Sequence, residues 1–425
     1  MARADLVAHV YRRLSMGPQP DLVASTRTPA DAIARALDLS APAATPAAFM
    51  PPTDFDAARD FTQILPVLAW WIGRMQDSPR LIEERLTWFW HDHFATGLQK
   101  VRVPYLMWQQ HLTIRRNATG NFATLLREIS RDPAMLVYLD GTTNSAQSRN
   151  ENFGREVMEL FTLGRGPYTE QDVVEVARAS TGWVNHIPGR PGARGLDNPP
   201  WTSTFVPARF DSGPKTILGR TGNFDLDGAL GVLLDHDATA EHIAGKLYRA
   251  IVGRRPSAAT VRRLGARFRD SGYEILPLVE AIVDLPDFLA GASVGVKPRS
   301  PVEKLVGLVQ AVPPPTGGLG AVGSGGRPSG VTGALRVLGY VPFAPPNVAG
   351  FPEGDALIGP HQLVHTMDLL SVYPRRPPVP PALDDLLARF ALIDVSDRTR
   401  RVLSREPDPA RRLALVLASP EYAVV

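Results

Sequence analysis

The chain has 425 residues and a mass of 46.2 kDa, with 46 Lys+Arg, 43 Asp+Glu and no cysteine. The lack of cysteine excludes disulfides, thiolate zinc sites, iron–sulfur clusters and a cysteine nucleophile. A formal net charge of +3 is too balanced to favour a nucleic-acid partner, and no apolar run is long enough for a transmembrane helix.

The N-terminal residues, MARADLVAHVYRRLSMGPQP, contain no apolar stretch after the basic pair. This pattern lacks the apolar region of a signal peptide. We therefore expect no signal peptide and a cytoplasmic protein.

Glycine and proline are clustered in a few segments of the chain, which contains 36 Gly and 40 Pro. The densest cluster is 312–330 (VPPPTGGLGAVGSGGRPSG), which predicts a linker or a loop. We therefore expect a main helical domain at 1–311 and a smaller C-terminal helical part at 331–425 that packs on the main body.

Between these clusters the apolar residues recur at helical spacing. The segment 80–95 (RLIEERLTWFWHDHFA) has one apolar stripe that includes His93, and Gly97 follows as a stop. Asp132 and Pro133 predict a helix start with Asp as the N-cap. Capping boxes are predicted at 148–151 and 169–172. Further helices are predicted at 236–252, 257–271, 274–291, 300–311, 361–372, 382–393 and 408–418.

Alternating strand patterns are scarce, so the predicted fold class is all-α. We expect one large multi-helix domain with long Pro/Gly-rich connectors.

Several segments together resemble a known bacterial family. They are HVYRRLSMGPQP (9–20), RLTWFWHDHFATG (85–97), GNFATLLREISRDPAMLVYLDG (120–141), NENFGREVMELFTLGRGPYTEQDVVEVARASTGW (150–183), DSGPKTILGRTG (211–222), KPRSPVEKLVG (297–307) and LGYVPFAPPNVAGFPEG (338–354). The family is catalogued as domain of unknown function 1800, and the resemblance covers essentially the whole chain. It implies no catalytic residues. It does imply a sulfatase-like protein as a candidate partner, and related proteins often look exported.

The triplet His91-Asp92-His93 is the first candidate site. Helix positions i and i+2 point about 200° apart, so the two histidines share one metal only if the helix ends or distorts there. His93 lies on the apolar stripe and His91 on another face. Each is either a catalytic acid or base tuned by burial, or a buried histidine satisfied by a carboxylate or a backbone oxygen.

The predicted 150–163 helix carries the second candidate cluster, Arg155, Glu156 and Glu159. Glu156 and Glu159 lie about 60° apart around the helix axis, on a stripe beside the apolar one. Two close carboxylates that are shielded from water repel each other, which raises the pKa of one of them, or they bind a divalent cation. On a solvated face each carboxylate instead forms weak ion pairs with basic side chains. If this helix packs on 80–95, then His93, Glu156 and Glu159 would form a metal site like those of helical metalloproteins.

Two further patterns are weaker. The segment 223–228 (NFDLDG) resembles the first half of a calcium loop, but Leu234 replaces the acid required at its twelfth position. We interpret it as an Asx turn before a helix. His361 and His365 share a helix face, and we interpret them as a surface or groove pair.

Two functional hypotheses follow. The first is an enzyme with a His/Glu site between two helices, in which His91 or His93 is a ligand or general base. Glu156 and Glu159 would hold a divalent metal or act as an acid/base pair, and Arg155 would hold a carboxylate or an anionic substrate. Metal-assisted or acid/base hydrolysis is the most economical class, because the sequence has no dinucleotide or P-loop motif. The alternative is a non-enzymatic scaffold or partner protein with a buried structural polar network.

Overall fold

A computed structural model describes residues 3–46, 61–185, 201–313, 330–373 and 378–425. In these ranges helices dominate, and the regular strands form two small antiparallel sheets. The all-α prediction is confirmed. No helix in the described part of the chain is both long and apolar enough to cross a bilayer.

The first half of the chain contains mostly short helices. They are α1 (Arg3–Leu14), α2 (Pro20–Ser25), α3 (Pro29–Leu37), η1 (Phe61–Gln63), α5 (Ile64–Asp77), α6 (Leu81–His93), α7 (Leu98–Val101), α8 (Pro104–Asn117), α9 (Phe122–Ser130), α10 (Pro133–Tyr138), η2 (Gly141–Thr143), α11 (Asn152–Glu156), the π-helical turn η3 (Val157–Thr162) and α12 (Glu170–Ala179). The two sheets pair β1 (Trp183–Asn185) with β2 (Ser203–Phe205) and β3 (Lys215–Ile217) with β4 (Arg220–Gly222). A short η4 (Pro207–Arg209) lies between the sheets in the sequence.

The described residues of the second half of the chain form helices joined by loops. It contains α13 (Leu226–Asp235), α14 (Asp237–Val252), α15 (Ala258–Asp270), α16 (Ile275–Val283), η5 (Gly291–Ser293), α17 (Pro301–Ala311), α18 (Gly330–Val337), η6 (Gly354–Leu357), α19 (Pro360–Thr366), η7 (Met367–Val372), α20 (Leu383–Arg389), α21 (Asp397–Arg405), α22 (Pro409–Leu417) and α23 (Pro420–Ala423).

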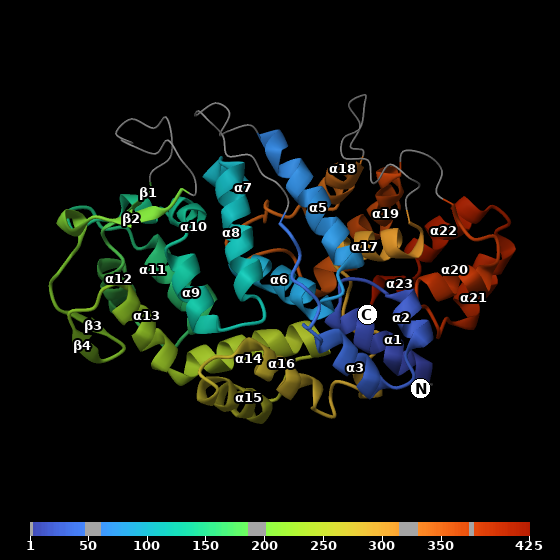
Figure 1. Cartoon of the computed structure of the whole chain (residues 1–425), viewed down its shortest axis with the longest axis horizontal. Coiled ribbons are helices and arrows are strands. Elements are labelled where there is room, and N and C mark those ends of the chain that lie inside the picture. The colour runs from blue at the N-terminus through green and yellow to red at the C-terminus, as the bar shows by residue number, and fades with distance from the viewer. Residues whose placement is uncertain (1–2, 47–60, 186–200, 314–329, 374–377) are drawn as a thin grey trace.

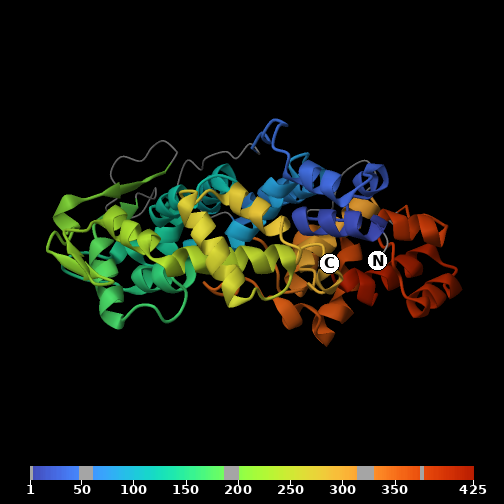
Figure 2. The same cartoon turned by 90° about the horizontal axis from the view of Figure 1, so that it is seen from below.

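The helix α14 organises the arrangement of the other elements. Figure 1 shows α14 below α6, with the N-terminal helices α1–α3 toward one side and α12 and α13 toward the other. Figure 2 shows α14 running along the long axis of the molecule. The C-terminal helices α20–α22 form the far end beyond the N-terminal helices, and a hydrogen bond from Arg12 Nη1 to Ala391 O (3.3 Å) joins the two regions.

Two apolar cores meet at α6. Trp90 belongs to the first core and stacks near Phe122, with ring centroids 5.5 Å apart. Trp88 points about 200° away from Trp90 around the helix and belongs to the second core. There it stacks near Tyr340 and Phe351, at 5.9 and 5.6 Å. Because both faces of α6 are covered, its side chains are held in place from two directions.

The buried charges of α6 are paired with other helices. Arg115 of α8 donates two hydrogen bonds to Glu84, at 2.7 and 2.6 Å. Arg85 contacts Glu303 of α17 at 2.5 Å. An unpaired charge at these positions would cost several kcal/mol, so the pairs fix α6 against α8 and α17.

The C-terminal residues return to the segment that precedes α17. Lys297 and Val425 exchange two backbone hydrogen bonds, at 3.2 and 2.8 Å. Tyr422 donates its hydroxyl hydrogen to Lys304 O at 2.5 Å. The second core likewise combines side chains from α5, α17, α18 and α20. Residues 314–329, most of the predicted linker, lie outside the described residues, and the domain boundaries stay a prediction.

Most predicted helices are present, and several predicted caps are observed. Asp132 caps α10 through the Met135 N–H, and the capping box at 169–172 begins α12. The 80–95 helix ends at His93, so Gly97 is instead the N-cap of α7. The helix predicted at 274–291 ends at Val283, where α16 stops.

The capping box predicted at 148–151 is wrong, because α11 begins only at Asn152. The N–H groups of Ser148 and Asn150 are taken up by Ser145 Oγ and Asn144 Oδ1. These residues therefore belong to a loop whose side chains satisfy its own backbone.

The segment 223–228 forms the predicted Asx turn, in which Asp225 caps α13 by accepting the Gly228 N–H at 2.9 Å. The second acid of this segment, Asp227, pairs with Arg131. His361 and His365 form a surface pair with ring centroids 4.6 Å apart.

Candidate functional site

The first feature of the candidate site is a mixed polar and aromatic face of α6. Arg85, Trp88, Phe89 and Asp92 follow one another at i, i+3, i+4 and i+7, which places them on one side of the helix. All four line a cavity of about 230 Å³. Their common face therefore forms one wall of this cavity.

The other walls come from segments far apart in the sequence. From α14 and the turn after it come Lys246, Arg249, Gly253, Arg254 and Arg255. The segment leading into α17 contributes Lys297 and Ser300, and α17 itself contributes Glu303. The stretch before η6 contributes Tyr340 and Glu353. Three of the segments that carry the family resemblance, 85–97, 297–307 and 338–354, thus meet at this cavity.

Asp92 is held at the cavity wall by a backbone contact. Its Oδ1 accepts the Phe351 N–H at 2.7 Å, and no hydrogen bond to Oδ2 is present within the described residues. Gly350 permits this approach: it has φ +100°, and a Cβ there would lie 2.4 Å from Asp92 Oδ1. One carboxylate oxygen is therefore anchored, and the other remains available.

The surroundings of Asp92 favour its protonated form. Burial raises the pKa of Asp92 to about 7, against the opposing effect of the Phe351 N–H, and the nearby charge of Glu353 adds to the rise. A pKa near neutrality suits a carboxyl group to general acid/base catalysis at neutral pH.

Lys246 and His93 form a second polar unit beside Asp92. Lys246 Nζ donates to His93 Nδ1 at 2.9 Å, and His93 Nε2 lies 3.3 Å from Phe161 O. These contacts fit a neutral imidazole that carries its proton on Nε2. Burial, followed by the charge of Lys246, lowers the pKa of His93 well below its usual value. Burial also lowers the pKa of Lys246.

His91 points to the other side of α6, as the 200° separation predicts. Its Nε2 accepts the Phe343 N–H at 3.1 Å, and burial lowers its pKa to about 3. His91 and Asp92 therefore both anchor the 338–354 stretch through backbone N–H groups.

An ion cluster lies beside Asp92 in the same cavity. Glu303 contacts Arg85 at 2.5 Å and Lys297 at 3.3 Å, and it accepts the Ser300 N–H at 2.8 Å. These partners hold the pKa of Glu303 well below its usual range even though it is buried. Burial lowers the pKa of Lys297 to about 8.

The second predicted cluster faces away from this cavity. Arg155 forms two hydrogen bonds with Glu170, at 2.9 and 2.6 Å. Glu159 pairs with Arg165 at 2.6 Å. Burial raises the pKa of Glu156, and the charge of Glu159 adds to that rise, as two neighbouring carboxylates should.

The helix of the second cluster reaches the first cluster through Phe161, whose ring and backbone oxygen both contact His93. The π-helical turn at 157–162 brings Phe161 O to His93, so the two helices do pack together. No hydrogen bond or ion pair within the described residues joins His91 or His93 to Glu156 or Glu159. The same residues contain no group of three His, Asp or Glu side chains placed to hold a metal ion.

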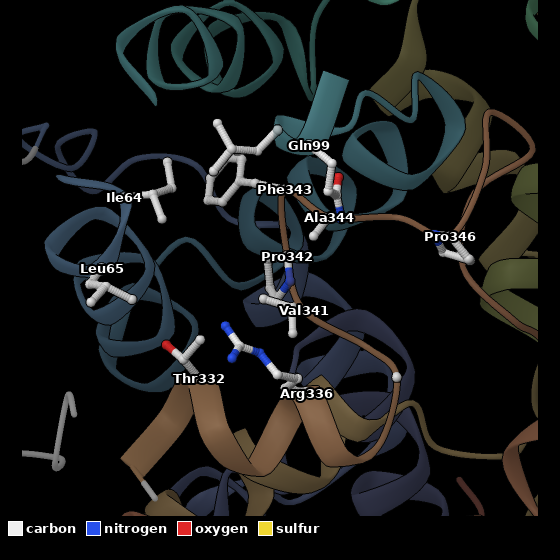
Figure 3. A pocket seen from close by; sticks show the side chains of 12 residues that line it. Ile64, Leu65, Gln99, Thr332, Arg336, Val341, Pro342, Phe343, Ala344 and Pro346 are labelled. Carbon is white, nitrogen blue, oxygen red and sulfur yellow. The ribbon is translucent and has the colours of Figure 1, made fainter. Parts of the chain in front are cut away.

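A larger cavity of about 480 Å³ lies on the other side of the 338–354 stretch. Its walls are mostly apolar, including Ile64 and Phe343, and its polar side chains are Gln99, Thr332 and Arg336. Figure 3 shows the Arg336 side chain lying between Thr332 and Val341. This larger cavity has no carboxylate among its described lining residues, so the cavity at Asp92 is the better candidate for catalysis.

Asp92 was predicted only as the middle residue of the His91-Asp92-His93 triplet, with no role of its own, and Lys246 was not among the site residues predicted from sequence. The spacing of Arg85, Trp88, Phe89 and Asp92 was an available signal, because a charged face on an otherwise apolar helix must find polar partners. Lys246 had no such signal, since only the packing of α14 on α6 brings it to His93.

The chain belongs to the family DUF1800, described as a protein of unknown function, whose model matches residues 9–424. No curated protein and no solved structure matches the chain.

Proposed function

Starting from membership of a family whose function is unknown, we propose that the protein is an enzyme that performs acid/base chemistry in the cavity at Asp92. The observation that carries this proposal is a carboxyl group with a pKa near 7, one oxygen of which is free of hydrogen bonds within the described residues. Strongly shifted groups gathered in a cavity are characteristic of active sites. Hydrolysis is the most economical reaction class.

Asp92 acts as the general base in this proposal. Its carboxylate takes a proton from water while the water oxygen bonds to the substrate. The bond between the substrate and its leaving group breaks, and the leaving group takes a proton from the Lys246 ammonium, which uses one N–H for His93 and has two more. Transfer of the proton from Asp92 to Lys246 through water restores both groups for the next cycle. His93 and the Phe351 N–H are positioning groups in this scheme, because each holds an acid/base group in place.

Substitution of Asp92 tests the proposal directly. The purified chain is assayed on neutral and anionic p-nitrophenyl esters, namely acetate, phosphate and sulfate. We expect Asp92→Asn to lower kcat by about 10²–10⁴-fold, since this is the usual contribution of a general acid/base group. The matched control is Asp140→Asn, which removes a carboxylate that pairs with Lys100 outside the cavity.

The pH profile adds a second readout. We expect the limb that reports the base to lie near pH 7, because burial raises the pKa of Asp92 to about 7. The proposal is contradicted if the Asp92→Asn variant hydrolyses the esters as fast as the unaltered chain. It is also contradicted if the substitution leaves the pH profile of the rate unchanged.

Metal-assisted hydrolysis at Glu156 and Glu159 is the narrower form of the enzyme proposal, without His93, whose ring nitrogens contact Lys246 and Phe161 O. The half-buried carboxylate pair supports it, because Glu156 and Glu159 repel each other and a divalent cation would relieve that repulsion. The test is elemental mass spectrometry of untagged protein. About one equivalent of metal, lost in a Glu156→Gln/Glu159→Gln double variant, supports the metal site; a metal-free, fully active protein refutes it.

A partner-binding role is the second candidate function, and an exposed apolar surface favours it. Ile358, Leu363, Val364 and Met367 are between 42% and 61% exposed although all four are apolar. Such a surface suits a protein partner, for which the sulfatase-like neighbour of the family is the candidate. Co-elution of the two purified proteins, abolished by Val364→Glu, would support this role; separate elution at micromolar concentration would refute it.

A further inference from the structure

A cluster of buried arginines lies behind the cavity at Asp92. Arg13 of α1, Arg85 of α6 and Arg299 before α17 are all at most 4% exposed. Glu303 is the carboxylate that serves this cluster, and Arg85, Lys297 and the Ser300 N–H already share it. The positive charge of the cluster therefore exceeds the negative charge beside it.

Several guanidinium N–H groups of this cluster have no hydrogen-bond partner within the described residues. They are Arg13 Nε and Nη1, Arg85 Nε and Arg299 Nη2. Buried donors of this kind are rare, because each unmade hydrogen bond to a charged group is costly. Burial, and then the charge of Arg85, lowers the pKa of Arg13, while Glu303 acts in the opposite direction.

The cluster reaches the cavity directly. Arg85 is itself a lining residue, and the Arg13 guanidinium lies against Gly253, another lining residue. A Cβ at Gly253 would lie 2.5 Å from Arg13 Nη2, so only glycine lets the guanidinium come this close to the cavity wall. Arg85 thus lies at the cavity wall itself, and Arg13 lies directly behind Gly253 of that wall.

The remaining walls add more positive charge and an apolar surface. Arg254 and Arg255 are exposed at the edge of the cavity, and Lys297 is half-buried within it. Trp88 and Tyr340 supply flat apolar walls. A cavity with an excess of cations concentrates anions, and guanidinium groups match the geometry of oxyanions.

We propose that the cavity at Asp92 binds the oxyanion group of a small ligand, with Arg85 and Lys297 as its inner contacts and Arg254 and Arg255 as its outer ones. The apolar walls take the organic part of the ligand. This inference names the substrate class of the enzyme proposed above and rests on that proposal for its catalytic meaning, but binding is measurable by itself.

Calorimetric titration of the full-length chain with inorganic sulfate, inorganic phosphate and acetate tests the inference. The ionic strength is held constant with chloride, and the titrant reaches about 10 mM, ten times the dissociation constant of a millimolar site. We expect saturable binding of at least one anion at one site per chain. A preference for sulfate or phosphate over acetate would identify a tetrahedral oxyanion, and the reverse would identify a carboxylate.

Variants separate site binding from general charge attraction. Arg254→Ala/Arg255→Ala should weaken binding about tenfold or more, as expected for the loss of charge-assisted hydrogen bonds. The matched control is Arg262→Ala/Arg263→Ala, an adjacent exposed pair on α15 with the same loss of charge. No saturable binding of any of the three anions, or equal weakening in both double variants, overturns the inference.

Asp92→Asn distinguishes this inference from the proposed function. Above about pH 7 the substitution removes a negative charge from the cavity, so anion binding measured there should be retained or tightened while catalysis is lost. Anion binding with unaltered catalysis would refute the catalytic role of Asp92 alone. Loss of catalysis in a protein that binds none of the three anions would refute the oxyanion inference alone.

Discussion

The pH dependence of stability offers a direct check on the environment of Asp92. Burial raises the pKa of its carboxyl from 3.8 to about 7. An acid with a raised pKa in the folded state binds more protons folded than unfolded between these two values. Stability therefore falls as the pH rises from about 4 to about 7, and the full cost is present above pH 7.

The size of this cost follows from the pKa difference. At 1.36 kcal/mol per unit, a rise from 3.8 to about 7 corresponds to about 4 kcal/mol. Asp92 is partly exposed to solvent, so we expect about half of this, about 2 kcal/mol. For 425 residues the unfolding entropy is about 0.9 kcal/mol/K, which converts 2 kcal/mol into about 2 °C of Tm.

Asp92→Asn removes the titrating group but keeps an oxygen to accept the Phe351 N–H. We expect its Tm, measured by scanning calorimetry, to lose about 2 °C less than that of the unaltered chain between about pH 4 and pH 8. Asp140→Asn, outside the cavity, should follow the unaltered chain. Identical pH profiles for Asp92→Asn and the unaltered chain would refute the raised pKa.

Three further predictions concern the same region. Glu303→Gln should lower the free energy of unfolding by about 3–5 kcal/mol in urea titrations, because it leaves Arg85 buried without its carboxylate; a loss below about 1 kcal/mol would contradict the buried pair. Gly350→Ala should lower the free energy of unfolding by about 2 kcal/mol, since the positive φ of Gly350 and the Asp92 carboxylate leave no room for a Cβ. Gly231→Ala, in open space within α13, should instead raise the free energy of unfolding by about 0.5–1 kcal/mol. Equal effects of the two substitutions would be inconsistent with this geometry. The imidazole of His93 should stay neutral between about pH 5 and 8 in NMR titrations, because its pKa lies well below the usual value. Below about pH 6.5 the unfolded chain protonates this histidine and the folded chain does not, so His93 lowers the stability as the pH falls.

Local sequence patterns predicted most of the helices correctly. The capping box at 169–172 and the N-cap Asp132 were recognisable because a cap depends on residues within one helical turn. The separation of His91 from His93 was likewise a matter of helix geometry, and the two rings do bind different partners.

The prediction at 148–151 failed for a reason that is also local but less regular. Side-chain oxygens of Asn144 and Ser145 satisfy the backbone N–H groups that a helix start would otherwise use. The π-helical turn at 157–162 was equally hidden, because a wider turn has no sequence pattern of its own here.

The sequence by itself determined the helical fold class, the family and the charged face of α6, since each depends on residue order within a short segment. Only the tertiary structure decided which of those residues meet. Lys246 reaches His93 from 153 positions away, and Phe351 reaches Asp92 from 259 positions away. Periodicity carries no information about such distances; the packing of α6 between two cores brings these groups into one cavity and shifts their pKa values by burial.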